Sequence, residues 1–175
     1  MKRSLNSWQL IGFSVTALGG VILHYLYELL GNAVWIAPFS GVNESTWEHM
    51  KLLFWPMLIY AVIQSCFYGE RKDYWCVKLR GILLGLVLIP VIFYTAGGVI
   101  GKLPDWFNIT IFFLSAAIAY IFETYLFNKA KVLCRHPKIA FFILIIVAVL
   151  FVVFTFFTPE IRLFRDPLTG TYGIQ

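Results

Sequence analysis

The chain has 175 residues, of which 60% are hydrophobic, 18% aromatic and 13% charged, and its mean hydropathy is +0.80. This composition excludes an ordinary soluble domain and indicates an integral membrane protein. The net charge of +5 does not indicate nucleic-acid binding, because the basic residues lie between apolar runs, where they orient a chain in the membrane.

Five long apolar runs predict five membrane-spanning helices. A helix needs about 20 apolar residues to cross the ~30 Å hydrocarbon core of a bilayer. Runs of this length lie at about 8–30, 50–68, 79–100, 107–127 and 139–157. We therefore expect an all-α fold, a single membrane domain over residues 1–175, in which the loop 31–48 and the tail 158–175 leave the membrane on the same side.

The basic residues between these runs predict the orientation of the chain. Ten of the 14 lie on the side of the N-terminus, namely Lys2, Arg3, Arg71, Lys72, Lys78, Arg80, Lys129, Lys131, Arg135 and Lys138. The other side holds Lys51, Lys102, Arg162 and Arg165. Because basic residues concentrate in cytoplasmic loops, we expect a cytoplasmic N-terminus and an extracytoplasmic C-terminus.

The three cysteines lie at or near the expected cytoplasmic side. They are Cys66, Cys76 and Cys134. Thiols stay reduced in the cytoplasm, so we expect no disulfide. The chain also has no CxxC, HExxH or GxSxG motif, so no standard redox or hydrolase motif is present.

Two pairs of glycines have the spacing that lets helices approach closely. Gly81 and Gly85 form one pair, and Gly97 and Gly101 form the other. Ordinary packing inside one bundle is the favoured interpretation of this spacing. A homo-oligomer formed through these glycine-rich helix faces is the alternative.

Five ionisable residues surround the end of the first predicted helix and the start of the second. His24 and Glu28 are four residues apart and project from one helix face. Glu44, Glu48 and His49 follow in the stretch that returns to the membrane. Ionisable groups at membrane depth are costly unless they find partners, so we expect these side chains to converge at the outer half of the bundle.

Two imidazoles and several carboxylates are a plausible ligand set for a divalent metal, with zinc first. We expect His24, Glu28 and His49 as metal ligands, and Glu44 and Glu48 as catalytic residues that activate a water for attack on an ester or amide. Haem held by the two histidines is a weaker alternative, because the neighbouring glutamates would surround the iron with negative charge.

Structural roles can also explain several of these residues. Ser45 and Glu48 have the spacing of a capping box, in which both side chains satisfy backbone N–H groups at a helix start. Glu44 can be a solvated loop residue, and His49 an interfacial one. Lys51 can pair with Glu48 or Glu44 across one helical turn.

Glu123 lies near the other end of the fourth predicted helix, far from these groups. We expect it to reach the membrane interface or to pair with Lys129 or Lys131. A proton path from Glu123 outward to Glu28 is conceivable in a transporter, although no polar residue of the sequence marks it.

The C-terminal tail leaves the membrane on the side of the cluster. Asp-Pro followed by Thr-Gly is typical of a turn. The tail is either a loose terminus or a short lid that brings Asp166 and Tyr172 over the site.

The segments HYLYELLGN, GVNESTWEHMKLLFWPML and DPLTGTYG resemble a family of small bacterial multi-pass membrane proteins whose function is unknown. The resemblance spans most of the chain. It implies a bacterial plasma-membrane protein in which these three segments act together, and it implies no activity.

The function that these residues favour is metal-dependent hydrolysis or group transfer on a lipid-like or peptide substrate that enters from the outer leaflet. A transporter or binding protein for a cation, proton or small solute is the alternative from another class. A structural subunit of a membrane complex is the third. The expected partners are membrane lipids.

Overall fold

The computed structural model describes residues 2–101, 103–129 and 133–174. It contains five long helices and a short 3-10 helix, which are α1 (Lys2–Leu29), α2 (Thr46–Tyr68), α3 (Tyr74–Ile100), α4 (Asp105–Asn128), α5 (Pro137–Phe156) and η1 (Arg162–Phe164). All five long helices are long and apolar enough to cross a membrane. The predicted all-helical, multi-pass architecture is therefore confirmed.

All five helices begin earlier than the apolar runs suggested, three of them by four residues or more. The first starts at Lys2, the second at Thr46 and the third at Tyr74. Hydropathy marks only the apolar part of a helix, whereas the backbone hydrogen bonds continue into polar turns until a cap ends them. In α2 this cap is Ser45, whose side chain accepts a hydrogen bond from the N–H of Glu48.

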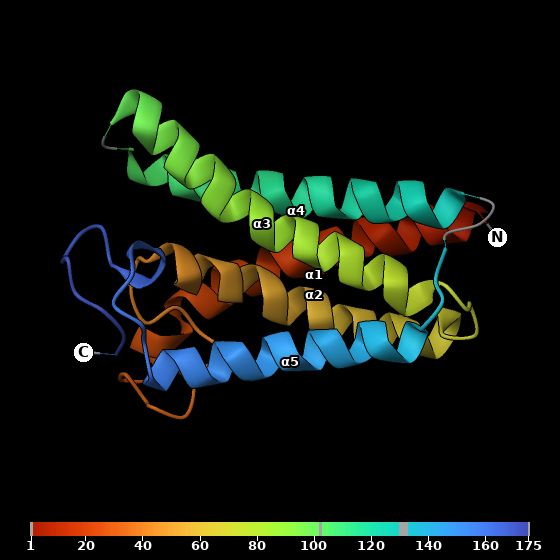
Figure 1. Ribbon diagram of the computed structural model, residues 1–175, viewed down its shortest axis with the longest axis horizontal. Helices are drawn as coiled ribbons and strands as arrows, with labels where there is room; N and C mark the ends of the chain where they lie inside the picture. Colours follow the sequence, from red (N-terminus) through yellow and green to blue (C-terminus); the bar gives the residue numbers. More distant parts are fainter. Residues whose placement is uncertain (1, 102, 130–132, 175) are drawn as a thin grey trace.

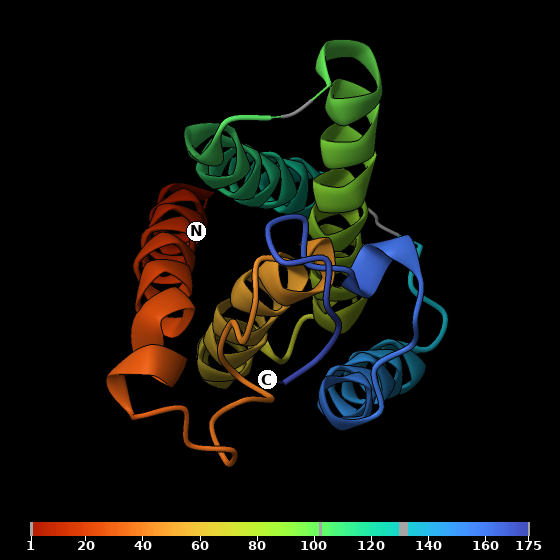
Figure 2. The ribbon, with the colours of Figure 1, turned by 90° about the vertical axis from the view of Figure 1, so that its left-hand side faces the viewer.

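The helices alternate in direction, so the two termini lie at opposite ends of the bundle (Figure 1). We call these the N-terminal end and the C-terminal end of the bundle. Seen from the C-terminal end, α2 lies in the middle of the other helices (Figure 2). It contacts α1, α3, α4 and α5, and it is the most buried of the five candidate spans. The core of the protein is therefore built around α2.

Glycines allow the closest approaches between helices. A Cβ at Gly81 would overlap the side chain of Glu123, and one at Gly85 would lie 2.8 Å from Leu53 and 3.3 Å from the Cβ of Ala119. The Gly81 and Gly85 pair thus packs α3 within the bundle, as predicted. Gly97 and Gly101 border a cavity instead, and a homo-oligomer stays a prediction.

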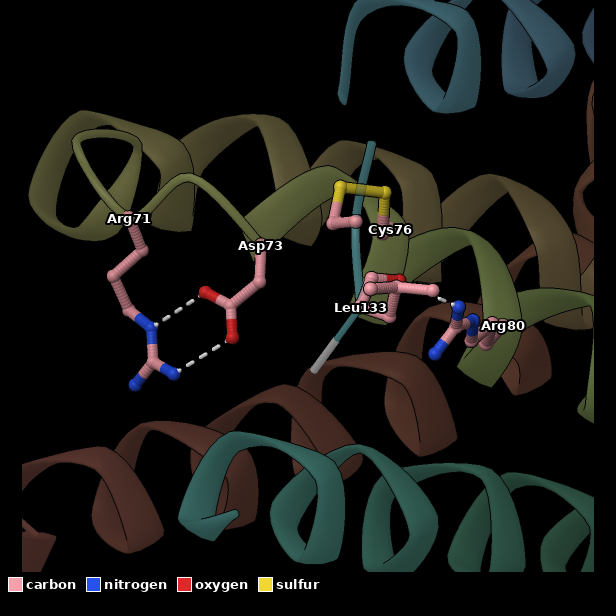
Figure 3. Close-up of a disulfide and its surroundings, with 6 residues drawn as sticks. Arg71, Asp73, Cys76, Arg80 and Leu133 are labelled. Carbon is pink, nitrogen blue, oxygen red and sulfur yellow. Dashed lines mark hydrogen bonds and ion pairs between the residues drawn. A yellow bond between two sulfur atoms is a disulfide. The ribbon is translucent and has the colours of Figure 1, made fainter. Parts of the chain in front are cut away.

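A disulfide joins Cys76 of α3 to Cys134, before α5 (Figure 3). Beside it, Arg71 forms two hydrogen bonds with Asp73. The expectation of no disulfide is therefore wrong for this structure. The sequence could not show that residues 58 positions apart have Cα atoms only 5.8 Å from one another. The third cysteine, Cys66, is free and exposed.

The C-terminal tail is docked on the C-terminal end of the bundle. Phe164 is buried against Trp47. Arg165 and Tyr172 form an isolated antiparallel bridge, and the side chain of Asn43 donates a hydrogen bond to the carbonyl of Gly173. The tail is thus tied to the loop between α1 and α2, which favours a specific position over a loose terminus.

Candidate functional site

Two histidines and one glutamate meet at the C-terminal end of the bundle. His24 comes from α1, Glu44 from the loop before α2, and His49 from the first turn of α2. The Nε2 atom of His24 lies 3.6 Å from Oε1 of Glu44, and the Nε2 atom of His49 lies 3.6 Å from Oε2. The two imidazole rings are 5.9 Å apart between their centroids. One carboxylate thus faces both imidazoles, and we call these residues the His–Glu–His cluster.

The hydrogen bond that Nδ1 of His49 forms determines whether the Nε2 atom facing Glu44 carries a hydrogen. The Nδ1 atom lies 2.9 Å from the carbonyl oxygen of Ser45. A carbonyl only accepts, so Nδ1 carries the hydrogen, and Nε2 of the neutral ring points a lone pair at the carboxylate. Two acceptors that face one another at this distance attract a proton, a cation or a donor group of a ligand.

The cluster is partly accessible. The side chains of His24, Glu44 and His49 are 29%, 35% and 14% exposed. A carboxylate held between two imidazoles and still reachable from outside is more than a solvated loop residue. The structure thus brings together three of the five ionisable residues that the sequence predicted to converge.

Local hydrogen bonds hold the loop that carries Glu44. The hydroxyl of Ser40 donates to the carbonyl of Leu23 and accepts from the N–H of Tyr27, so the loop folds back on α1. The N–H of Ser45 donates to the side chain of Asn43. The backbone around Glu44 is therefore fixed on both sides.

Glu48 has a structural position next to the cluster. Its carboxylate accepts from the N–H of Val42 at 3.0 Å and lies 2.6 Å from the Nζ of Lys51. Lys51 is fully buried and also donates to the carbonyl of Ala37 and to Thr155. The predicted pairing of Lys51 with Glu48 is confirmed. Half of the predicted capping box forms, because the Glu48 carboxylate turns to Val42 and Lys51.

Glu28 does not join the cluster. Its side chain is exposed, and it lies one turn beyond His24, next to Leu29, the last residue of α1. The two residues share a helix face as expected, but the loop that supplies Glu44 crosses at the level of His24. The predicted ligand set of His24, Glu28 and His49 is therefore not assembled.

Within residues 2–101, 103–129 and 133–174, no group of three or more His, Cys, Asp or Glu side chains is arranged to hold a metal ion. The metal that the sequence predicted stays a prediction. Haem also stays a prediction. Glu44 lies 3.6 Å from each of the two imidazoles that would be its axial ligands.

A cavity of about 780 Å³ opens from the His–Glu–His cluster into the bundle. The cluster and Asn108 supply the polar part of its lining, and the rest is mostly apolar or glycine. Among the lining residues are Val21, Leu52, Phe93, Leu103, Ile109, Phe112 and Phe113. Helix α3, which supplies part of this lining, runs obliquely, and its C-terminal end diverges from α2 and α5 (Figure 1).

The cavity reaches the surface of the bundle beside α1 and α4. Val21 and Tyr25 of α1 and Ile109 of α4 line it and are themselves more than 40% exposed. All three lie in helices long and apolar enough to span a membrane. The cavity therefore opens through a face of the bundle that candidate membrane spans form.

The tail covers the part of the cavity beside the cluster. Pro167 and Leu168 line the cavity. The carboxylate of Asp166 accepts from the N–H groups of Leu168 and Thr169 and, at 3.5 Å, from the N–H of Glu44. Of the two residues predicted for a lid, Asp166 thus contacts the cluster backbone, while Tyr172 packs against the hydrophobic core.

Sequence reasoning missed Asn108, which lines the cavity. Its Oδ1 is buried and has no hydrogen-bond partner among the described residues. An amide in an otherwise apolar membrane helix was the available signal.

The structure gives Glu123 a partner that the sequence did not predict. Glu123 is buried, and its Oε2 lies 2.6 Å from the Nζ of Lys78. It does not reach the interface, and of its two expected partners Lys131 lies outside the described residues. The sequence could not indicate a pairing between helices that depends on the facing of α3 and α4.

The family of unknown function DUF6512 matches residues 1–174. The chain therefore belongs to this family, in agreement with the resemblance found in its sequence. No curated protein and no solved structure matches the chain.

Proposed function

We propose that this member of the DUF6512 family binds an amphiphilic molecule of the bilayer, with the apolar part in the cavity and the polar group at the His–Glu–His cluster. One observation carries the proposal: the ionisable residues that line a large, mostly apolar cavity, His24, Glu44 and His49, lie together, with Glu44 3.6 Å from each imidazole. Sites for small molecules usually have ~300–1,000 Å³, apolar walls and a few convergent polar groups, and this cavity has all three features.

The cluster favours a ligand whose polar group can donate hydrogen bonds. A hydroxyl, amine or water placed between Glu44 and His49 would satisfy the lone pairs that face each other there. An imidazole with a fixed tautomer beside a carboxylate is also a general base. The chemistry that this arrangement supports is hydrolysis or transfer at an ester or amide of a lipid-like substrate, with His49 taking the proton and Glu44 stabilising the resulting imidazolium.

Two neighbouring glycines of α3 offer a matched test of the cavity. Gly97 lines it, and a Cβ there would contact Leu103 at 3.9 Å. Gly98 is exposed, and a Cβ there would have nothing within 4 Å among the described residues. We expect native mass spectrometry of the purified protein to detect a bound amphiphile in wild type and in Gly98→Phe, but not in Gly97→Phe.

The polar part of the lining is tested by Glu44→Gln, which keeps the shape of the side chain and removes its charge. We expect this variant to retain less of the amphiphile than wild type. Equal retention by wild type, Gly97→Phe and Glu44→Gln would reject the proposal, because the adduct would then be lipid bound to the outside of the bundle.

A divalent metal, zinc first, is the second candidate for the same position. Two ligands that bind zinc at about 2.1 Å in a tetrahedral site lie roughly 3.4 Å apart, close to the 3.6 Å between each Nε2 and Glu44. Side-chain rotation would have to complete such a site. Near one equivalent of zinc, lost in both His24→Ala and His49→Ala, would support it, and folded wild-type protein free of metal after growth and purification with zinc would reject it.

The orientation is proposed with the cavity end outside the cytoplasm, in the bacterial plasma membrane. The support is the excess of Lys and Arg at the N-terminal end. The disulfide of Cys76 at that same end favours the opposite orientation, because disulfides persist in oxidising compartments. An impermeant maleimide applied to intact cells should label Leu168→Cys in a Cys66→Ser background, and labelling only after lysis would reverse the assignment.

A further inference from the structure

A second polar cluster lies at the opposite end of the bundle, within two turns of the helix ends there. Glu123 of α4 accepts hydrogen bonds at one oxygen, Oε2, from Lys78 of α3 at 2.6 Å and from Gln9 of α1 at 3.2 Å. All three side chains are buried. The rings of Tyr60, Tyr74, Tyr120 and Phe127 surround the Lys78 ammonium at 5.6 to 5.9 Å.

Packing alone does not explain this cluster. A buried ion pair gives little or no net stability compared with apolar residues of the same volume, and ionisable residues inside membrane helices often belong to ion or proton pathways. The other oxygen of Glu123, Oε1, has no hydrogen-bond partner among the residues that the structure describes. A fully buried carboxylate is therefore left with one free acceptor.

Helix α4 carries a row of such groups. Asn108, Ser115 and Glu123 are seven and eight residues apart, which places them on one side of the helix. In the described part of the chain, Asn108 Oδ1, Ser115 Oγ and Glu123 Oε1 are each buried without a hydrogen-bond partner. At ~1.5 Å of rise per residue they lie about 10 and about 12 Å apart along the axis.

This row lies between the two polar clusters. Asn108 lines the cavity beside the His–Glu–His cluster, Ser115 lies midway, and Glu123 belongs to the cluster with Lys78. Buried polar atoms without protein partners are where internal water molecules bind. Glycines of α3 face the row, because a Cβ at Gly81 would overlap Glu123 and one at Gly85 would lie 3.7 Å from the carbonyl of Ser115.

We propose that protons cross the bundle along this face of α4, between the cavity and the Lys78–Glu123 pair, through water held by Asn108 and Ser115. A proton arriving from the cavity binds Oε1 of Glu123 and leaves a neutral carboxylic acid, while Oε2 keeps its bond to Lys78. Loss of this proton toward the N-terminal end restores the carboxylate. This inference does not depend on the amphiphile bound in the cavity.

The charged and titratable groups around Glu123 come from every neighbouring helix. Lys78 and Tyr74 belong to α3, Tyr60 to α2, and Tyr120 to α4 itself, while α1 contributes the neutral Gln9. Among these, Lys78 supplies the positive charge that balances the carboxylate. Tyr74 and Phe127 pack with Leu5 over the pair, so these rings cover its exit at the N-terminal end.

Proton flux into liposomes tests the proposal directly. Purified protein is reconstituted with a trapped pH-sensitive dye, and a potassium gradient with valinomycin supplies the driving force. We expect acidification faster than in protein-free liposomes. The rate should fall to that of protein-free liposomes in Glu123→Gln and should decrease in Ser115→Ala, which removes only the midway hydroxyl.

Two matched variants serve as controls, because they change the same side chains outside the row. Glu28→Gln neutralises an exposed carboxylate of α1, and Ser14→Ala removes an exposed hydroxyl that bonds within α1. Both should keep the wild-type rate. If Glu123→Gln does not fold, the double variant Lys78→Met/Glu123→Met removes the charges as a pair and should also be inactive.

The proposal is overturned if wild-type liposomes acidify no faster than protein-free ones. It is also overturned if the folded Glu123 variants and Ser115→Ala keep the wild-type rate, since the flux would then use another route.

Discussion

Two lysines, Lys51 and Lys78, have side chains that are 0% and 2% exposed, each against a glutamate. The partner of Lys51 lies three residues earlier on the same helix, so helical geometry alone predicts it. The partner of Lys78 lies 45 residues away on α4. That pairing depends on how α3 and α4 face each other, which hydropathy does not encode.

The Lys78–Glu123 pair gives a stability prediction. Replacing Glu123 by Met leaves an unpaired buried ammonium and should lower the free energy of unfolding by about 3–5 kcal/mol. The double variant Lys78→Met/Glu123→Met should recover most of this loss, because both charges are gone. Unfolding in detergent micelles measures both values, and a double variant less stable than the single one would contradict the account.

The predicted convergence of His24, Glu44 and His49 is found in the structure. It follows because the loop between α1 and α2 begins and ends at the same end of the bundle. The role of each residue was harder to assign. Glu28 shares the helix face of His24 but lies beyond the level at which the loop crosses. Glu48 is drawn away by Lys51, whose buried ammonium needs an anionic partner.

At the scale of the helices, hydropathy predicts their number and approximate extent, because each must fill the bilayer thickness with apolar residues. It places the helix starts too late in the chain, because polar residues such as Thr46 continue the backbone hydrogen-bond pattern ahead of the apolar run. It also cannot predict the direction in which α3 leaves the bundle. The cavity depends on that direction and was therefore not predicted.

Close packing of α3 on α4 gives a prediction for one glycine. Gly81→Ala adds a Cβ that overlaps Glu123, so it should destabilise the protein by roughly 1–3 kcal/mol. Gly98→Ala, at an exposed position of the same helix, should be neutral or stabilise by up to about 1 kcal/mol. Thermal unfolding of the two variants side by side checks this, and equal midpoints would show that α3 does not pack closely at Gly81.

The disulfide that joins Cys76 of α3 to Cys134 before α5 gives a prediction for the cysteines. Purified, unreduced protein that is denatured and alkylated should carry one label, on Cys66, and three labels after reduction, as mass spectrometry would count them. Cys66→Ser should lose the single label. Three labels without reduction would show that Cys76 and Cys134 are not joined in the purified protein.

At the scale of the whole molecule, the polar chemistry is divided between the two ends of the bundle. The C-terminal end holds the cavity, the His–Glu–His cluster and the docked tail, and the N-terminal end holds the Lys78–Glu123 pair. The middle of the bundle is packed around α2. The row of Asn108, Ser115 and Glu123 runs along α4 between the two ends. This division agrees with the two proposals, in which an amphiphile binds at the C-terminal end and protons pass between the cavity and the N-terminal end.

Photo-crosslinking with an amphiphile that carries a diazirine in its apolar chain tests the central claim most directly. Mass spectrometry of the digested protein should place the crosslinks on cavity residues such as Phe93, Leu103 and Phe113. Gly97→Phe should abolish these crosslinks, and Gly98→Phe should not. Crosslinks confined to exposed residues outside the cavity, such as Leu18 and Ile146, would contradict the account, because the amphiphile would then only surround the bundle.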